Sequence, residues 1–289
     1  MNFDKAHLMT AMVTPFDDQQ QVDDQRLEKL INHLIAHHTQ GLLVGGTTGE
    51  GPTLSDDEKI DLFTKTVAFV AGRVPIIANT GSNSTASTIK FTQRVSRIAG
   101  IDAALVVVPP YNKPDQAGML EHFTAVADQG GLPIMIYNIP GRVVVKMTVP
   151  TILALAQNPN IIGIKQCTDD AELAAVISGA PAGFYVYTGE DGQTLTNQVL
   201  GGHGVISVAS HVFGDDMATM LAASATGDLK TAGTIQRQLL PRMAALFSAP
   251  SPAPVKAVLN AQHILVGAPR LPILPLTAAQ QSALLTKIK

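Results

Sequence analysis

The chain has 289 residues, of which 46% are hydrophobic and 15% charged, so it can bury a large core and is not expected to be disordered. Its formal net charge of -3 and its scattered basic residues argue against nucleic acid and anionic lipid surfaces as partners. No apolar run approaches the roughly 20 residues of a membrane-spanning helix, no export signal opens the chain, and the single cysteine cannot form an intrachain disulfide, so we expect a cytoplasmic protein.

Eight short apolar runs recur along the first two thirds of the chain. They occupy residues 8–13, 41–45, 74–79, 103–108, 133–138, 161–165, 184–188 and 204–208. Most are continuous rather than alternating, which is typical of strands that are covered on both faces in a parallel sheet.

Helix-length segments separate most of these runs. They occupy residues 23–39, 55–70, 84–98, 115–129, 149–157 and 170–177. In the first segment Leu27, Ile31 and Leu34 fall on one side of a helix. Ser55 is followed three residues later by Glu58, which predicts a capping box at the start of the second.

A strand followed by a helix, repeated eight times, predicts an α/β fold of the TIM (β/α)8 barrel type. A doubly wound sheet is the alternative, but residues 14–16, Thr-Pro-Phe, are not the glycine-rich dinucleotide turn that normally follows its first strand. Beyond residue 211 we expect helices rather than strands, at 215–226, 229–247, 254–265 and 277–289. We therefore expect a catalytic barrel at 1–212 and a C-terminal helical domain at 213–289.

Lys165 closes the sixth apolar run, and an amine at the end of a buried strand is poorly solvated. We interpret it as a Schiff-base lysine. Attack on a ketone requires a neutral amine, so we expect burial to lower the pKa of Lys165 from its ordinary value of about 10.4. The alternative is that Lys165 forms an ion pair with Asp169 and only stabilises the fold.

Other polar residues follow neighbouring runs and are expected on the same barrel face. Tyr137 is a phenol placed to move protons during imine formation, or a tyrosine that simply packs and hydrogen-bonds. Thr47 and Thr48 lie in a glycine-flanked turn suited to a carboxylate or phosphate. Arg142 offers a fork for a second carboxylate, or is a solvated loop charge.

Three features are weaker candidates for chemistry. His33 and His37 have metal-ligand spacing, but no third ligand follows, so we expect no metal. Cys167 lacks a clear histidine partner and is expected to be a half-buried side chain. Glu190 and Asp191 are expected to cap a helix or bind substrate hydroxyls rather than Mg²⁺.

Taken together, these motifs resemble the dihydrodipicolinate synthase family in order and spacing. The matching segments are GTTGE at 46–50, PPYNKP at 109–114, YNIPGR at 137–142, GIK at 163–165 and GHGVISV at 202–208. The resemblance implies a pyruvate-dependent lyase of the class I aldolase type on a TIM barrel, with no cofactor. It implies condensation of pyruvate with L-aspartate 4-semialdehyde to 4-hydroxy-tetrahydrodipicolinate, in the diaminopimelate and lysine pathway.

The same resemblance implies catalytic roles for four residues. Lys165 would form the imine with pyruvate, and Tyr137 would be the proton shuttle. Thr48 and Tyr111 would complete a proton relay, with Tyr111 reaching across a dimer interface. Catalysis would then require the dimer, and two dimers would form a homotetramer.

Binding roles follow in the same way. Thr47 and Thr48 would bind the carboxylate of pyruvate, and Arg142 the carboxylate of the semialdehyde. Gly189 and Ile206 would line the pocket through their backbone. The sialic acid lyases and 2-keto-3-deoxy sugar acid aldolases share the lysine and tyrosine and remain alternatives, although Thr47 and Arg142 favour the synthase. A non-catalytic ligand-binding barrel is a further alternative.

The resemblance also bears on regulation. Positions that form the lysine effector site in lysine-inhibited members match Asp56, Lys59, Ser87 and Pro110 here. A cationic effector would lack the glutamate that binds it in those members and would instead lie near the positively charged Lys59. We therefore expect that L-lysine does not inhibit this protein at millimolar concentration.

Overall fold

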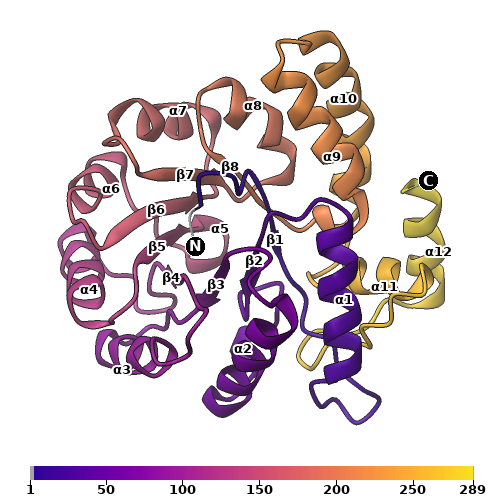
Figure 1. Ribbon diagram of the computed structural model, residues 1–289, viewed down its shortest axis with the longest axis horizontal. Helices are drawn as coiled ribbons and strands as arrows, with labels where there is room; N and C mark the ends of the chain where they lie inside the picture. Colours follow the sequence, from indigo (N-terminus) through magenta and orange to yellow (C-terminus); the bar gives the residue numbers. More distant parts are fainter. Residues whose placement is uncertain (1–2, 289) are drawn as a thin grey trace.

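Eight parallel strands close into a barrel in the computed structural model, which describes residues 3–288. The strands are β1 (Leu8–Ala11), β2 (Gly41–Val44), β3 (Ile76–Asn79), β4 (Ala103–Val107), β5 (Ile134–Asn138), β6 (Ile161–Gln166), β7 (Tyr185–Thr188) and β8 (Gly204–Ser207). They follow one another around the ring in chain order, and β1 pairs with β8 (Figure 1). The predicted TIM barrel is confirmed.

Helices surround this ring on the outside (Figure 1). They are α1 (Asp24–Ala36), α2 (Asp56–Val70), α3 (Thr85–Val95), α4 (Gln116–Gln129), α6 (Val149–Leu155), α7 (Asp170–Gly179) and α8 (Thr194–Val199), with the short α5 (Pro140–Val143) after β5. The capping box predicted for α2 is present, because Ser55 accepts from the Glu58 N–H while the Glu58 carboxylate accepts from the Ser55 N–H.

The apolar side chains form layers on both faces of the sheet. Met9, Leu43, Met135 and Tyr187 belong to a cluster inside the barrel. Two further clusters join the outer face of the strands to the surrounding helices. Because both faces are buried, the strands read as continuous apolar runs, as predicted.

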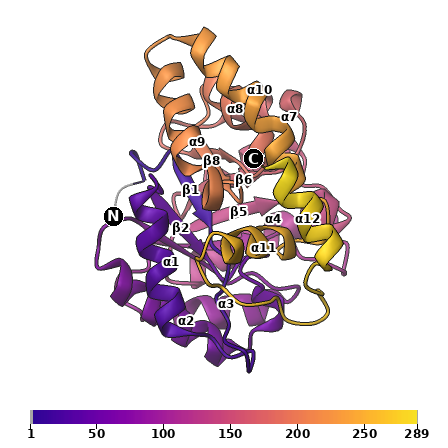
Figure 2. The same ribbon diagram turned by 90° about the vertical axis from the view of Figure 1, so that its right-hand side faces the viewer.

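The chain continues into four helices on one side of the barrel, α9 (Ser210–Ala225), α10 (Leu229–Ala245), α11 (Ala253–Ala261) and α12 (Ala278–Lys287), which Figure 2 brings to the front. Helix α9 begins at Ser210, five residues before the predicted start, and its backbone leaves helical geometry at Phe213. Our predicted domain boundary after residue 212 falls inside α9, next to this interruption, and stays a prediction.

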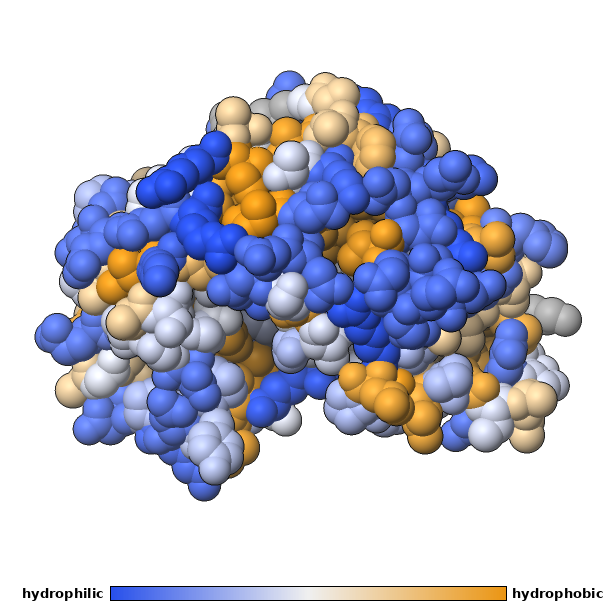
Figure 3. Space-filling model, turned by 90° about the horizontal axis from the view of Figure 1, so that it is seen from below, coloured by the Kyte–Doolittle hydropathy of each residue, from blue (hydrophilic) through white to orange (hydrophobic). Residues whose placement is uncertain are grey.

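Hydrophilic residues cover most of the face seen in Figure 3, where hydrophobic residues form separate small patches. Within residues 3–288, no helix is both long and apolar enough to cross a lipid bilayer.

Candidate active site

Lys165 and Tyr137 lie side by side near the carboxyl ends of two adjacent strands. They are register partners in the β5–β6 ladder, and the Lys165 Nζ is 4.7 Å from the centre of the Tyr137 ring. Both side chains are buried. Asp169, the alternative partner of Lys165, instead caps α7 by accepting from the Glu172 N–H at 2.9 Å.

The next residue of each strand carries a side-chain amide, and these two amides, of Asn138 and Gln166, form a buried pair. The Asn138 Nδ2 donates to the Gln166 Oε1 at 3.1 Å and to the Met147 carbonyl at 3.1 Å, and the Asn138 Oδ1 accepts from the Met147 N–H. These bonds tie the ends of β5 and β6 together. They hold the adjacent phenol and amine in a fixed relation.

The Lys165 side chain lines a cavity of about 350 Å³. Its lining residues are Thr47, Thr48, Tyr137, Ile139, Gly141, Arg142, Lys165, Cys167, Gly189, Glu190, Val208, Phe247 and Ser251. Six of the eight residues predicted for the site are therefore brought together, from the ends of four different strands and the loops that follow them. An amine, a phenol, two hydroxyls and a guanidinium around one small cavity suit the binding and activation of a 2-oxo acid.

Two predicted residues do not line this cavity. Tyr111 is 90% exposed, on a backbone in the left-handed region with φ of 72°. Ile206 is buried among the apolar side chains inside the barrel. Within a single chain, Tyr111 thus takes no part in the cavity.

Of the two threonines, Thr47 acts on the pKa of the Tyr137 phenol: burial raises that pKa, and side-chain hydrogen bonding with Thr47 opposes the rise. The resemblance had implied a relay through Thr48, whose side chain is buried in the cavity wall. The turn after β2 presents the first of its two hydroxyls to the phenol. This favours Thr47 for the relay, while the role of Thr48 stays a prediction.

The pKa of Lys165 is raised, opposite to the direction predicted from the sequence. Burial acts to lower it, but Coulombic attraction to Tyr137, Cys167, Asp191 and Glu190 more than offsets burial, with the phenol and the thiol contributing only at the high pH at which they ionise. The prediction was wrong because it considered desolvation and not the acidic groups that converge on the amine. At neutral pH the resting site therefore holds an ammonium.

The groups beside the amine hold their protons tightly. Burial raises the pKa of the Tyr137 phenol, and it raises the pKa of the Cys167 thiol to about 12. Cys167 is thus a neutral thiol at neutral pH. It is not a candidate nucleophile.

Gly189 leaves room for the lysine side chain. A Cβ at this position would lie 2.2 Å from the Cys167 Sγ and 2.6 Å from the Lys165 Cε, so both side chains would have to move. Any larger residue would displace the reactive amine. The glycine is required by this contact rather than by its backbone conformation.

Asp191 is a structural member of the site that the sequence only partly indicated. Its buried carboxylate accepts from the Ser207 Oγ, the Val208 N–H and the Ala209 N–H, and thereby fixes the end of β8. Burial raises its pKa to about 6. It also faces the ammonium of Lys165.

Phe247 and Ser251 were missed by sequence reasoning. They lie between α10 and α11, in the C-terminal part, and yet they line the cavity. A search of strand ends cannot find them, because their loop reaches the site only through tertiary packing. No local pattern in residues 247–251 marks them.

The described residues include no group of three or more His, Cys, Asp or Glu side chains arranged for a metal ion. His33 and His37 stack on each other with ring centres 4.4 Å apart, and the His37 Nδ1 is 2.9 Å from an Asp215 oxygen. They are accounted for by contacts between α1 and α9.

Comparisons with known proteins show the family to which this chain belongs. The profile of the "Dihydrodipicolinate synthetase family" matches residues 4–289. A 4-hydroxy-tetrahydrodipicolinate synthase of Ligilactobacillus salivarius is 54% identical over 289 residues, which is 100% of each chain.

Solved structures agree as well. A dihydrodipicolinate synthase of Bacillus anthracis has a TM-score of 0.97 at 42% identity, covering 100% of this chain and 98% of the other. A chloride-inhibited dihydrodipicolinate synthase of Acinetobacter baumannii, complexed with pyruvate, has a TM-score of 0.94 at 34% identity and covers 98% and 97%. This chain belongs to the dihydrodipicolinate synthetase family.

Proposed function

We propose that this protein is a 4-hydroxy-tetrahydrodipicolinate synthase, a lyase that condenses pyruvate with L-aspartate 4-semialdehyde through an imine on Lys165. The observation that carries the proposal is a buried amine beside a phenol, at the floor of a cavity of about 350 Å³. The full-length relatives named above support the activity and its place in diaminopimelate and lysine biosynthesis. A cytoplasmic location stays a prediction.

Pyruvate binding is assigned to the turn after β2. Thr47 and Thr48 of this turn line the cavity, and their hydroxyl groups suit a carboxylate. A carboxylate held there would direct its neighbouring ketone carbon toward Lys165. Binding thus supplies the orientation that imine formation requires.

Imine formation begins when the Lys165 ammonium loses a proton to solvent. The neutral amine then attacks the ketone carbon, and the resulting carbinolamine loses its oxygen as water, with Tyr137 donating the proton to that oxygen. The Tyr137 phenolate then takes a proton from the methyl carbon, which gives an enamine and restores the phenol. Thr47 holds the Tyr137 hydroxyl in place for these transfers.

The second half of the reaction uses the open side of the cavity. Arg142 is exposed at this position and would bind the carboxylate of the semialdehyde. The enamine carbon attacks the aldehyde, and the amino group of the bound substrate then displaces Lys165 from the imine carbon. This transimination closes the ring and releases the enzyme.

The assembly is part of the proposal. Tyr111 is exposed in its own subunit, and we assign it to the active site of a neighbour within a homotetramer built from two dimers. An exposed tyrosine held in a left-handed backbone conformation is suited to insertion into another chain.

Trapping tests the imine directly. Incubation with pyruvate and borohydride, followed by peptide mass measurement, is expected to place a reduced pyruvyl group on Lys165 alone, and Lys165→Ala should take up none. Assays with L-aspartate 4-semialdehyde and with sialic acid or 2-keto-3-deoxy sugar acids then separate the synthase from its sister aldolases. Label on another residue, or cleavage of sugar acids without synthase activity, would contradict the proposal.

A further inference from the structure

A buried ion pair connects the C-terminal helices to the turn that carries Thr47 and Thr48. The Lys256 Nζ of α11 lies 2.6 Å from the Glu50 Oε1, and the two side chains are 1% and 3% exposed. Among the described residues no hydrogen-bond donor of good geometry reaches this oxygen, so the ionic contact with Lys256 is what compensates its burial.

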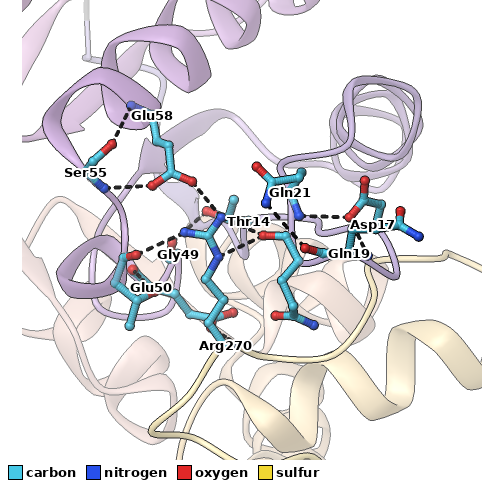
Figure 4. A network of polar contacts seen from close by, with 11 residues as sticks. Thr14, Asp17, Gln19, Gln21, Gly49, Glu50, Ser55, Glu58 and Arg270 are labelled. Atoms are coloured by element: carbon cyan, nitrogen blue, oxygen red, sulfur yellow. Dashed lines mark hydrogen bonds and ion pairs between the residues drawn. The ribbon is translucent and has the colours of Figure 1, made fainter.

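Arg270 holds the other oxygen of the same carboxylate, as Figure 4 shows. The Arg270 N–H donates to the Glu50 Oε2 at 2.7 Å. Its guanidinium donates to the Thr53 carbonyl at 3.0 Å and to the Glu58 Oε1 at 2.6 Å. A single residue of the C-terminal segment therefore contacts the connection between β2 and α2, at Glu50 and Thr53, and the first turn of α2, at Glu58.

Phe16 keeps the two cations in place. Its ring lies 4.2 Å from the Lys256 Nζ and 4.5 Å from the Arg270 guanidinium carbon. The face of an aromatic ring attracts a cation, and this attraction offsets part of the free-energy cost of removing the cation from water. The C-terminal segment is thus anchored to the barrel at a fixed position relative to Glu50.

The backbone of the turn makes this anchor relevant to the active site. Glu50 has a left-handed backbone with φ of 56°, which is unfavourable for a residue other than glycine. Its N–H donates to the Thr47 carbonyl at 3.1 Å, and the Gly49 carbonyl accepts from the Thr14 Oγ1 at 2.6 Å. Glu50 therefore binds Lys256 through its side chain and, through its backbone N–H, closes the turn that begins at Thr47.

We propose that Lys256 and Arg270 are positioning residues for the reaction, because through Glu50 they hold the turn that presents Thr47 to Tyr137 and to the substrate carboxylate. This inference rests on the proposed function. It makes the C-terminal part a component of the active site, in addition to supplying Phe247 and Ser251 to the cavity wall.

A role in stability alone predicts a different outcome. Buried ion pairs are often no more stabilising than well-packed apolar residues, so stability is a weak reason for this one. A positioning role requires that kinetic constants change even when the fold is kept. The two roles are separated by variants that remove the pair without leaving a bare charge.

The test uses two variants. One is the single variant Lys256→Met, and the other is a double variant that carries both Glu50→Gln and Lys256→Met. Both are expected to raise KM for pyruvate and lower kcat, with a loss of at least about tenfold in kcat/KM, because the turn is no longer held. Lys256→Met leaves Glu50 unpaired and can fail to fold, in which case the double variant, which buries no charge, decides. Thermal unfolding and circular dichroism establish that each variant is folded.

Arg242→Met is the matched control. Arg242 makes the same kinds of contact within the C-terminal part, to the Phe213 ring at 4.4 Å, the Asp216 carboxylate at 3.1 Å and the Ile288 carbonyl at 3.0 Å, and it does not touch the turn. It should lose stability with unchanged kcat and KM. Wild-type kinetics in the folded double variant, or an equal kinetic loss in Arg242→Met, would overturn the inference. Absence of pyruvyl label on wild-type Lys165 would instead refute the proposed function.

Discussion

The Thr47 hydroxyl bonds to the Tyr137 phenol, whereas Thr48 lies in the cavity wall beside it. We expect Thr47→Val to lower kcat by about 100-fold, because the phenol loses the partner that orients it for proton transfer. Thr48→Val should chiefly raise KM for pyruvate. Steady-state kinetics of both variants, with trapping at Lys165 as a check on imine formation, distinguish the two. Equal losses of kcat in the two variants would indicate that both hydroxyl groups take part in the proton relay.

His211 makes the fold sensitive to acid. Its imidazole is buried, with the Nε2 accepting from the Val13 N–H at 3.1 Å and the Nδ1 bonded to the Val208 carbonyl at 2.8 Å. Burial lowers its pKa to about 4, below the ordinary value of 6.5. Because the unfolded chain binds a proton more readily between these values, unfolding becomes easier as pH falls from about 6.5 toward 4.

The expected loss of unfolding free energy from this group is about 3 kcal/mol. His211→Gln can keep both bonds without titrating, so urea unfolding at pH 7 and pH 4.5 should show a smaller loss in the variant than in the wild type. Comparing the two proteins cancels the opposite contribution of Asp191, whose pKa is raised to about 6. The same pH dependence in both would exclude His211.

At the scale of the elements, the barrel was predictable because each strand is buried on both faces. The run that contains β6 is apolar up to Lys165, and that placement alone identified the amine as unusual. Strand ends were predicted less well. The Val13 N–H, inside the first predicted run, donates to His211 instead of to a neighbouring strand.

Helices α5 and α8 could not be predicted from apolar periodicity. α8 buries Thr194 and Asn197, and the Asn197 Nδ2 donates to the Gly204 carbonyl at 2.7 Å, so its inner face is polar. α5 is a single turn that carries Arg142. The raised pKa of Lys165 was equally hidden, because it depends on side chains that only the fold brings together.

The surface between α2 and α3 leads to a prediction about regulation. The Lys59 Nζ lies 5.3 Å from the centre of the Phe91 ring and Arg94 lies 5.9 Å from it, and these two cations form ion pairs with Asp56 and Asp57. A cationic amino acid would have to compete with Lys59 and Arg94 for these carboxylates. We expect steady-state rates to be unchanged by millimolar L-lysine, relative to potassium chloride at equal ionic strength. Half-inhibition below that range would show that the effector site is intact.

At the scale of the whole molecule, two parts outside the barrel strands bear on the site. The C-terminal helices contribute Phe247 and Ser251 to the cavity and contact the turn through Lys256. Tyr111 extends away from its own cavity and is available to another chain. A site assembled in this way depends on packing between parts as well as on the strand ends.

Mixing two inactive variants tests the contribution of a second subunit. In a mixed dimer of Tyr111→Phe and Lys165→Ala, one site combines an intact Lys165 with the intact Tyr111 of its neighbour, while the other site lacks both. Each variant alone should have little activity. Refolding or co-expressing them in equal amounts is expected to restore about a quarter of the wild-type rate, because half of randomly formed dimers are mixed and each has one complete site.

The control is to mix Tyr137→Phe with Lys165→Ala. Both of these residues lie in one subunit's cavity, register partners on adjacent strands, so no mixed dimer contains a complete site and no activity should return. Restoration in the first mixture and not in the second would establish that Tyr111 acts across the interface. If neither mixture regains activity although mass measurement finds mixed dimers, Tyr111 serves only its own chain, and assembly is then not a requirement for the chemistry at Lys165.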